Sequence, residues 1–176
     1  AATRFTFDPA IEGSPVWSPD GTRIVFRSNR SGTADLFERP ILVTPLAKSP
    51  QDWSPDGRYL LYTVQDPKTG ADVWALPMVG DRKPFPVVQT GFNEVHAQFS
   101  PDGRSIAYAS DETGRFEIYV RPFPGPGGKW QVSAAGGTVP RWRRDGKELF
   151  YISPDDNVMA AEVSVRDQAF TVGAVR

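Results

Sequence analysis

The chain has 176 residues, 39% of them hydrophobic, which is enough to bury the core of one ordinary domain. Its 20 Lys and Arg nearly balance its 21 Asp and Glu, so a surface that binds nucleic acid or another polyanion is not expected. Without cysteine the chain has no disulfide, no thiol nucleophile and no thiolate metal ligand.

The apolar residues occur in short runs. None reaches the roughly 18 residues that a transmembrane helix needs, so we expect no direct membrane insertion. The first residues, AATRFTFDPA, lack the charged and apolar succession of a signal peptide. The 16 Gly and 17 Pro separate the apolar runs, a pattern typical of many short strands joined by tight turns.

One turn motif recurs four times. It reads WSPDG at 17–21 and 53–57, FSPDG at 99–103 and WRRDG at 142–146. Proline presets φ for a type I turn, Asp tolerates the next position, and Gly can adopt the left-handed conformation that returns the chain. The aromatic residue before each turn is expected to end a strand and to pack between neighbouring units. We interpret the motif as scaffold.

Each turn begins a unit with the same order of elements. An apolar run follows it, at 23–28, 59–64, 105–110 and 148–153. An acidic, an aliphatic and an aromatic residue come next, at 35–37, 72–74 and 117–119, with the weaker copy NVM at 157–159. A last run closes the unit, at 41–44, 85–90, 129–134 and 169–174. This pattern predicts four strands of about four to six residues per unit and no helix.

Four-stranded units at a period near 43 residues are typical of a β-propeller. We therefore predict an all-β chain, a single β-propeller segment over 1–176 with about four antiparallel blades, as part of a larger propeller. The predicted blades cover 14–46, 50–91, 95–135 and 138–176. Residues 1–10 are interpreted as a stray outer strand of a preceding blade. Alternatively, that strand pairs with the last blade, or two chains close a ring; open blade edges favour self-association.

The first unit is shorter than the others. Asp35 and Trp53 are 18 residues apart, whereas the corresponding separations in the next two units are 27 and 25. The deficit falls where a hairpin is expected, so we predict that roughly 7 to 9 residues are removed or unrecorded near Pro40 and Ile41, by comparison with the hairpins of the other units.

The repeat SPDG…IAYASDETGRFEIYVRPFPG resembles the TolB-like propeller repeats, relatives of the WD-repeat propellers, over nearly the whole chain from Ser14. The segment TRFTFDPAIEGSPVWSPDGTRIVFRSNRSGTADLF is similar to the propeller region that follows the kinase domain of many bacterial serine/threonine protein kinases. Prolyl-oligopeptidase-type serine peptidases carry similar repeats. The resemblance implies a propeller, often of six or more blades, that serves as a binding or gating surface. The kinase likeness, with a membrane span upstream, favours a periplasmic or other extracytoplasmic location.

Catalytic motifs are absent from the sequence. It contains no G-x-S-x-G nucleophile elbow and none of the kinase motifs, so we expect the chain alone to be no enzyme. GPGGK at 125–129 is interpreted as a hairpin turn, and RWRRDGK at 141–147 as a turn without nucleic-acid binding. The acidic segments 66–72 and 153–158 lack the ligand spacing of a calcium loop. No metal or other cofactor is therefore predicted.

A ligand at the mouth of the propeller channel would meet residues at the innermost strands. The candidates by equivalent position are Glu12, Gln51, Glu94, His96 and Arg141. The leading hypothesis is a non-catalytic module of a larger bacterial protein, a kinase-linked sensor among others, that binds a protein or peptide or senses a ligand. The alternative is the gating propeller of a serine peptidase, or a hydrolase with its site in the channel.

Overall fold

The computed structural model describes residues 4–38, 40–125, 127–166 and 169–176, and it builds them from strands and turns. The sixteen strands form four antiparallel sheets of four, and each sheet takes consecutive strands in chain order. Sheet 1 contains β1 (Glu12–Trp17), β2 (Ile24–Ser28), β3 (Asp35–Phe37) and β4 (Pro40–Leu42), and sheet 2 contains β5 (Lys48–Trp53), β6 (Tyr59–Asp66), β7 (Gly70–Pro77) and β8 (Phe85–Val88). Sheet 3 contains β9 (Glu94–Phe99), β10 (Ser105–Ser110), β11 (Glu117–Pro122) and β12 (Trp130–Gln131), and sheet 4 contains β13 (Thr138–Trp142), β14 (Glu148–Ile152), β15 (Val158–Arg166) and β16 (Ala169–Val175).

The predicted all-β propeller with four-stranded antiparallel blades is therefore confirmed. Sheets 1 to 4 are called blades 1 to 4 from here on. Strand lengths vary more than expected, from two residues in β12 to nine in β15. The first three blades begin one or two residues before the predicted limits, at Glu12, Lys48 and Glu94.

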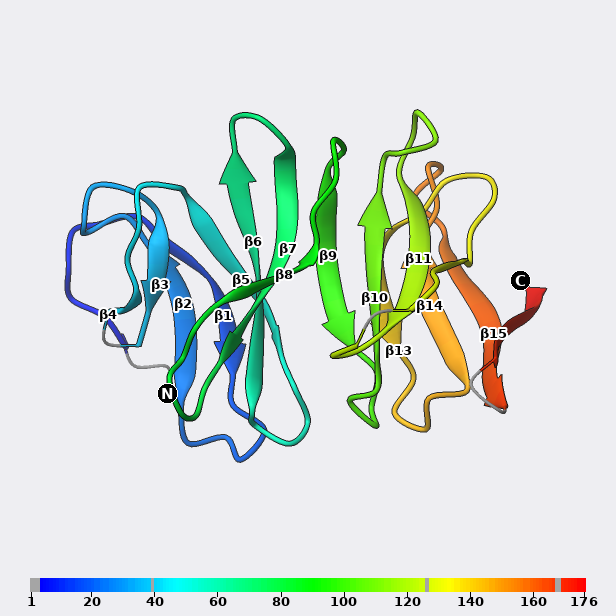
Figure 1. Ribbon diagram of the computed structural model, residues 1–176, viewed down its shortest axis with the longest axis horizontal. Helices are drawn as coiled ribbons and strands as arrows, with labels where there is room; N and C mark the ends of the chain where they lie inside the picture. The colour runs from blue at the N-terminus through cyan, green and yellow to red at the C-terminus, as the bar shows by residue number, and fades with distance from the viewer. Residues whose placement is uncertain (1–3, 39, 126, 167–168) are drawn as a thin grey trace.

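The blades stand side by side in chain order, with blade 1 at one end of the row and blade 4, next to the C-terminus, at the other (Figure 1). The first strands of successive blades, β1, β5, β9 and β13, pack against one another. Among the described residues, blade 4 contains β13 to β16, and the pairing of an N-terminal strand with the last blade stays a prediction. Residues 4–10 form no strand.

The repeated turn has the same hydrogen bonds in three blades. The hydroxyls of Ser18, Ser54 and Ser100 each donate to the Asp of their own turn at 2.6 Å. The turn glycines adopt φ values of 69° to 74°, the left-handed conformation that the motif predicted. In blade 4 Arg143 replaces the serine, and its guanidinium donates to both carboxylate oxygens of Asp145, at 2.8 and 2.5 Å. Blade 4 therefore has the same turn geometry as the other blades, with an arginine in place of the serine as the donor to the aspartate.

The core lies between the blades. Val25 and Leu36 of blade 1 pack with Trp53 and Leu60 of blade 2 in one cluster of buried side chains. Phe99 belongs to the cluster between blades 2 and 3, and Trp142 packs against the cluster between blades 3 and 4. The aromatic residues before the turns thus pack between units as predicted, with the exception of Trp17, which is 59% exposed on the leading face of blade 1.

The shortened hairpin of blade 1 closes tightly. Phe37 of β3 pairs with Pro40 of β4, which leaves only positions 38 and 39 between the two strands. Residue 39 lies outside the described residues. The hypothesis that residues are removed near Pro40 and Ile41 stays a prediction.

Candidate functional site

The innermost strands of the four blades, β1, β5, β9 and β13, together form the inner wall of the row of blades. Each of them has an irregularity at the same place. The pairing between the first and second strand of every blade shifts register near the middle of the first strand. Ser14, His96 and Val139 occupy equivalent positions there and adopt φ values of 50°, 56° and 52°. Such bulges bend a strand and re-aim its side chains, and the left-handed conformation of a bulky residue is costly.

A hollow of about 280 Å³ lies beside one of these bulges. Its wall includes Arg27 of blade 1, Gln51, Thr63 and Gln65 of blade 2, and His96 of blade 3. Three successive blades thus contribute polar side chains to one place. Within the described part of the chain, the Oγ1 of Thr63 and the Nδ1 of His96 are buried without a hydrogen-bond partner. Buried polar atoms of this kind are rare in folded proteins and require an explanation.

His96 is the only histidine of the chain. Burial lowers the pKa of the imidazole, and the nearby positive charge of Arg141 lowers it further. The ring is therefore neutral at neutral pH, with one nitrogen as donor and the other as acceptor. Arg141 itself donates a hydrogen bond of 2.7 Å from Nη1 to the carbonyl of Pro140.

The five candidate residues do not form one site. Gln51 and His96 line the hollow together, and Arg141 lies close enough to His96 to affect its pKa. Glu12 is instead ion-paired with Arg30, and Glu94 is completely buried between blades 2 and 3. Whether Gln51, His96 and Arg141 bind a ligand stays a prediction.

Apart from Gln51 and His96, none of the residues that line the hollow was identified from the sequence. Arg27, Thr63 and Gln65 come from the second strands, β2 and β6, whereas the interpretation of the sequence considered the innermost strands alone. Arg27 and Thr63 lie within the apolar runs 23–28 and 59–64, and Gln65 directly follows the second run. The order of residues does not tell which of them reaches the inner wall.

Two side chains of the innermost strands join neighbouring blades. The carboxylate of Asp52 accepts hydrogen bonds from the backbone N–H of Trp53 at 2.9 Å and from that of Phe99, in the next blade, at 2.8 Å. Gln98 occupies the same place one blade later, and its Oε1 accepts a bond of 2.9 Å from the N–H of Trp142. Burial raises the pKa of Asp52 to about 6, although both hydrogen bonds and Arg141 favour the charged form.

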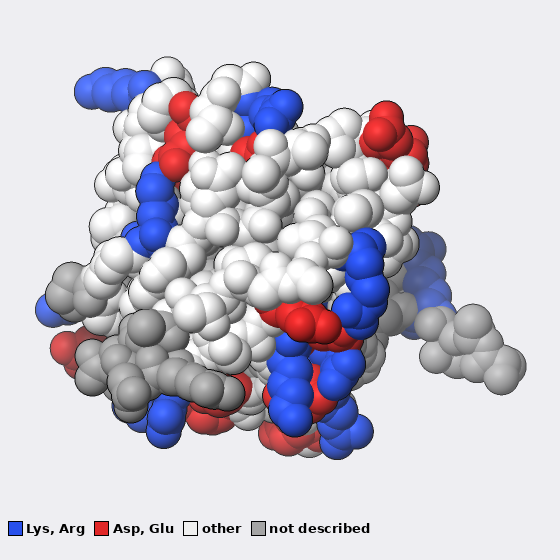
Figure 2. Space-filling model, turned by 90° about the vertical axis from the view of Figure 1, so that its right-hand side faces the viewer, with Lys and Arg blue, Asp and Glu red and all other residues white. Residues whose placement is uncertain are grey.

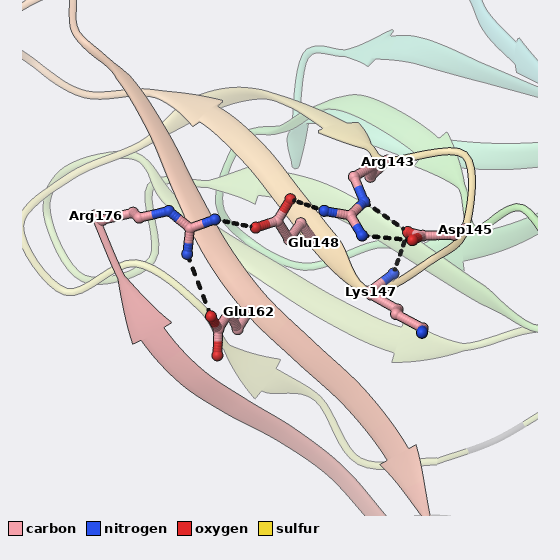
Figure 3. Close-up of polar contacts among 6 residues, drawn as sticks. All are labelled: Arg143, Asp145, Lys147, Glu148, Glu162 and Arg176. Carbon is pink, nitrogen blue, oxygen red and sulfur yellow. Dashed lines mark hydrogen bonds and ion pairs between the residues drawn. The ribbon is translucent and has the colours of Figure 1, made fainter.

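A second hollow, of about 520 Å³, lies on the free face of blade 4 and is lined partly by charged residues. Figure 2, in which the blade 4 end of the molecule faces the viewer, shows a broad uncharged area bordered by basic and acidic side chains. In Figure 3, Arg143 connects Asp145 with Glu148, and Arg176 connects Glu148 with Glu162. Hydrogen bonds from Arg143 lower the pKa of both Asp145 and Glu148.

This network pairs its own charges, so we interpret it as structural. The ammonium of Lys147 is drawn without a partner in Figure 3, while its backbone N–H donates to Asp145 at 3.0 Å.

The described residues contain no helix that could span a membrane.

The four four-stranded antiparallel sheets, packed side by side, define the class of protein: they are four blades of a β-propeller. No protein-family model matches the chain. An uncharacterized protein of Agrobacterium fabrum is 31% identical over 131 residues, which cover 72% of this chain and 39% of that protein. The structure of TolB from Acinetobacter baumannii superimposes with a TM-score of 0.67 at 20% identity, over 93% of this chain and 43% of that chain.

A TolB-type structure from Agrobacterium tumefaciens also gives a TM-score of 0.67, at 17% identity, over 94% of this chain and 81% of that chain. The chain therefore has the TolB-type β-propeller fold that its repeats resemble. It spans less than half the length of the Agrobacterium fabrum relative and of Acinetobacter TolB.

Proposed function

We propose that this chain is a non-catalytic β-propeller module that binds a protein or peptide ligand at the hollow between β2, β6 and β9. One observation carries the proposal: side chains from three blades converge there, and two of their buried polar atoms have no hydrogen-bond partner among the described residues. A ligand that supplies those bonds removes the cost of leaving them unmade.

The chemistry of the wall fits a polar, extended ligand. The exposed Arg27 offers up to five N–H donors, and Gln51 and Gln65 offer both donors and acceptors. A peptide backbone, or a carboxylate held by Arg27, matches this set. The acid–base pair of a hydrolase is missing from the same wall, because His96 is its single titratable side chain apart from Arg27 and the buried Lys48.

The role in the whole protein follows from the resemblance of the sequence to kinase-linked propellers. In a larger bacterial protein, the module would present the hollow to a partner or a signal and pass the binding event to a fused domain. A sensing role requires that the module binds a ligand, so ligand binding is tested first.

The test is selection of peptides from a random displayed library against the purified chain, followed by affinity measurement with two variants and the unmodified chain. In the hollow variant, Gln51→Ala combined with His96→Ala, we expect affinity for selected peptides to fall at least about tenfold, roughly 1.4 kcal/mol. Lys83→Ala, on an ammonium group that is 85% exposed away from the hollow, is the control and should bind normally. Peptides that bind all variants equally would place the site elsewhere, and a library without binders would count against a peptide ligand.

The alternative is a propeller that gates a serine peptidase. The motivation is the likeness of the repeats to prolyl-oligopeptidase-type propellers, and the discriminating observation is a G-x-S-x-G motif in the flanking gene sequence. A hydrolase with a channel site would instead lose turnover on substitution of His96.

A further inference from the structure

Each interface between neighbouring blades buries a carboxylate at or near the start of the third strand of a blade. The residues are Asp35, Asp72 and Glu117, and all three are at most 1% exposed. A buried carboxylate must be compensated by hydrogen bonds, by a cation or by a proton. The three interfaces differ in how they do so.

Between blades 1 and 2 the compensating group is an ammonium. The Nζ of Lys48 donates to the Oδ1 of Asp35 at 2.8 Å and to the carbonyls of Thr44 and Leu46 at 3.3 and 2.5 Å. The other oxygen of Asp35 accepts from the hydroxyl of Ser31 at 2.7 Å. One negative and one positive charge are thus buried together, and both are hydrogen-bonded.

Between blades 3 and 4 the compensating groups are a backbone N–H, a hydroxyl and a guanidinium. Glu117 accepts from the N–H of Gly136 at 2.9 and 3.0 Å, from the hydroxyl of Ser133, and from the Nε of Arg115 at 2.7 Å. The position of Lys48 is taken here by Gly137, where a Cβ would come within 2.8 Å of Ile118. This interface has no room for a long side chain at that position.

Between blades 2 and 3 the position of Lys48 is taken by an acid. Glu94 begins β9 as Lys48 begins β5, and it is completely buried, as is Asp72. The two segments adjoin, because the backbone N–H of Ala71, next to Asp72, donates to the Oδ1 of Asn93, next to Glu94, at 3.2 Å. Among the described residues, no Lys or Arg forms an ion pair with Asp72 or Glu94.

Each of the two acids has one satisfied and one unsatisfied oxygen. The Oδ2 of Asp72 accepts from Thr69 at 2.6 Å and from Gln89 at 3.4 Å, and the Oε1 of Glu94 accepts from the hydroxyl of Thr90 at 2.5 Å. The Oδ1 of Asp72 and the Oε2 of Glu94 are buried and lack a hydrogen-bond partner in the described part of the chain. The unpartnered oxygen of Asp72 corresponds to the oxygen of Asp35 that binds the Lys48 ammonium.

We propose that a divalent cation of the calcium type binds between blades 2 and 3, held by Asp72 Oδ1 and Glu94 Oε2, where the preceding interface holds the Lys48 ammonium. Charge supports a divalent ion, because two carboxylates balance it as one carboxylate balances the ammonium. Oxygen ligands suit calcium, which also accepts backbone carbonyls and hydroxyls.

Further oxygens are available at the same place. Thr90 and Phe92 precede Glu94 by the same spacing as Thr44 and Leu46 precede Lys48, and those two carbonyls hold the ammonium. The carbonyl of Phe92 faces the start of β7, 3.5 Å from where a Cβ on Gly70 would lie. The bound ion would fasten blade 2 to blade 3.

The proposal is tested by calcium titration of the full chain after treatment with a chelator and dialysis. Calorimetry should show one Ca²⁺ per chain, and Ca²⁺ should raise the melting temperature in a concentration-dependent way. Asp72→Asn and Glu94→Gln should each weaken Ca²⁺ binding at least tenfold. Asp81→Asn removes one exposed charge outside the site, and it should bind as the unmodified chain does.

A fourth variant keeps the test informative if the others fold poorly. Glu94→Lys recreates the acid–ammonium pair of the preceding interface, so its melting temperature should be independent of Ca²⁺. The proposal is wrong if calcium fails to bind the unmodified chain, or if binding survives in both Asp72→Asn and Glu94→Gln. Absent calcium binding together with an unchanged melting temperature in Glu94→Gln would show that a proton, and not a metal, neutralises the pair.

Discussion

The leading face of blade 1 and the interface between blades 1 and 2 contain the same five residues in different surroundings. Trp17 and Trp53 both begin a WSPDG turn with the same hydrogen bonds. Trp17 is 59% exposed and Trp53 is 5% exposed. Trp53 packs with Val25 and Leu36, and its Nε1 donates to the carbonyl of Gly57 at 3.0 Å. The motif therefore determines the turn, while the adjacent blade determines whether the aromatic side chain stabilises the fold.

The largest effect should come from truncating the buried copy. Trp53→Ala is expected to lower the free energy of unfolding by about 3–5 kcal/mol, since it removes a large side chain from a packed interface and leaves a cavity. Trp17→Ala is the matched control, with an expected change within about 0.5 kcal/mol. Chemical denaturation followed by tryptophan fluorescence and circular dichroism measures both. Equal losses in the two variants would mean that the leading face is covered in solution, and a mass that rises with concentration would then identify a second copy as the cover.

The second effect separates a compensated interface from an uncompensated one. Lys48→Met keeps the bulk of the side chain but leaves Asp35 charged and buried, which should cost about 3 kcal/mol. The double variant Asp35→Asn with Lys48→Met removes the stranded charge, so it should recover part of that loss. Urea melts of the two variants test this, and a double variant less stable than Lys48→Met would contradict the charge argument.

The third effect is a pH dependence that the leading face lacks, because Val16 stands there in place of Asp52. The pKa of Asp52 rises from 3.8 to about 6 in the folded chain, so the folded state retains its proton longer than the unfolded state. The stabilisation is complete below pH 3.8 and is lost as the pH rises to about 6. The expected total loss, complete once the pH has passed through about 6, is about 3 kcal/mol from this group.

Asp52→Asn isolates that contribution. The variant cannot titrate at this position, so its free energy of unfolding should change less between pH 4 and pH 6 than that of the unmodified chain. The difference between the two profiles is the measurement. Parallel profiles would show that Asp52 is solvated well enough to keep an ordinary pKa.

The repeat in the sequence was sufficient to predict the blades, because four-stranded units cannot bury their apolar faces alone and stacking them is the remaining solution. It was not sufficient for the sites. Gln51 and His96 were named from their strands, but Thr63 joins them only through the bulges that re-aim the inner wall. Glu94 looked like a rim residue, and its burial against Asp72 depends on how two blades meet. Contacts between blades have no fixed spacing along the chain.

The smallest effect concerns the polar bond that joins blades 3 and 4. Gln98→Ala removes the acceptor of the Trp142 N–H and should lower the free energy of unfolding by about 1 kcal/mol, the net value of one hydrogen bond. Gln65→Ala, an exposed glutamine on β6, is the control and should change it by less than about 0.5 kcal/mol. At the interface between blades 1 and 2, the N–H of Trp53 instead donates to the carboxylate of Asp52 in its own blade. A loss of stability in Gln98→Ala but not in Gln65→Ala would therefore show that the hydrogen bond between blades 3 and 4 stabilises the fold. At the first interface the equivalent bond lies within blade 2.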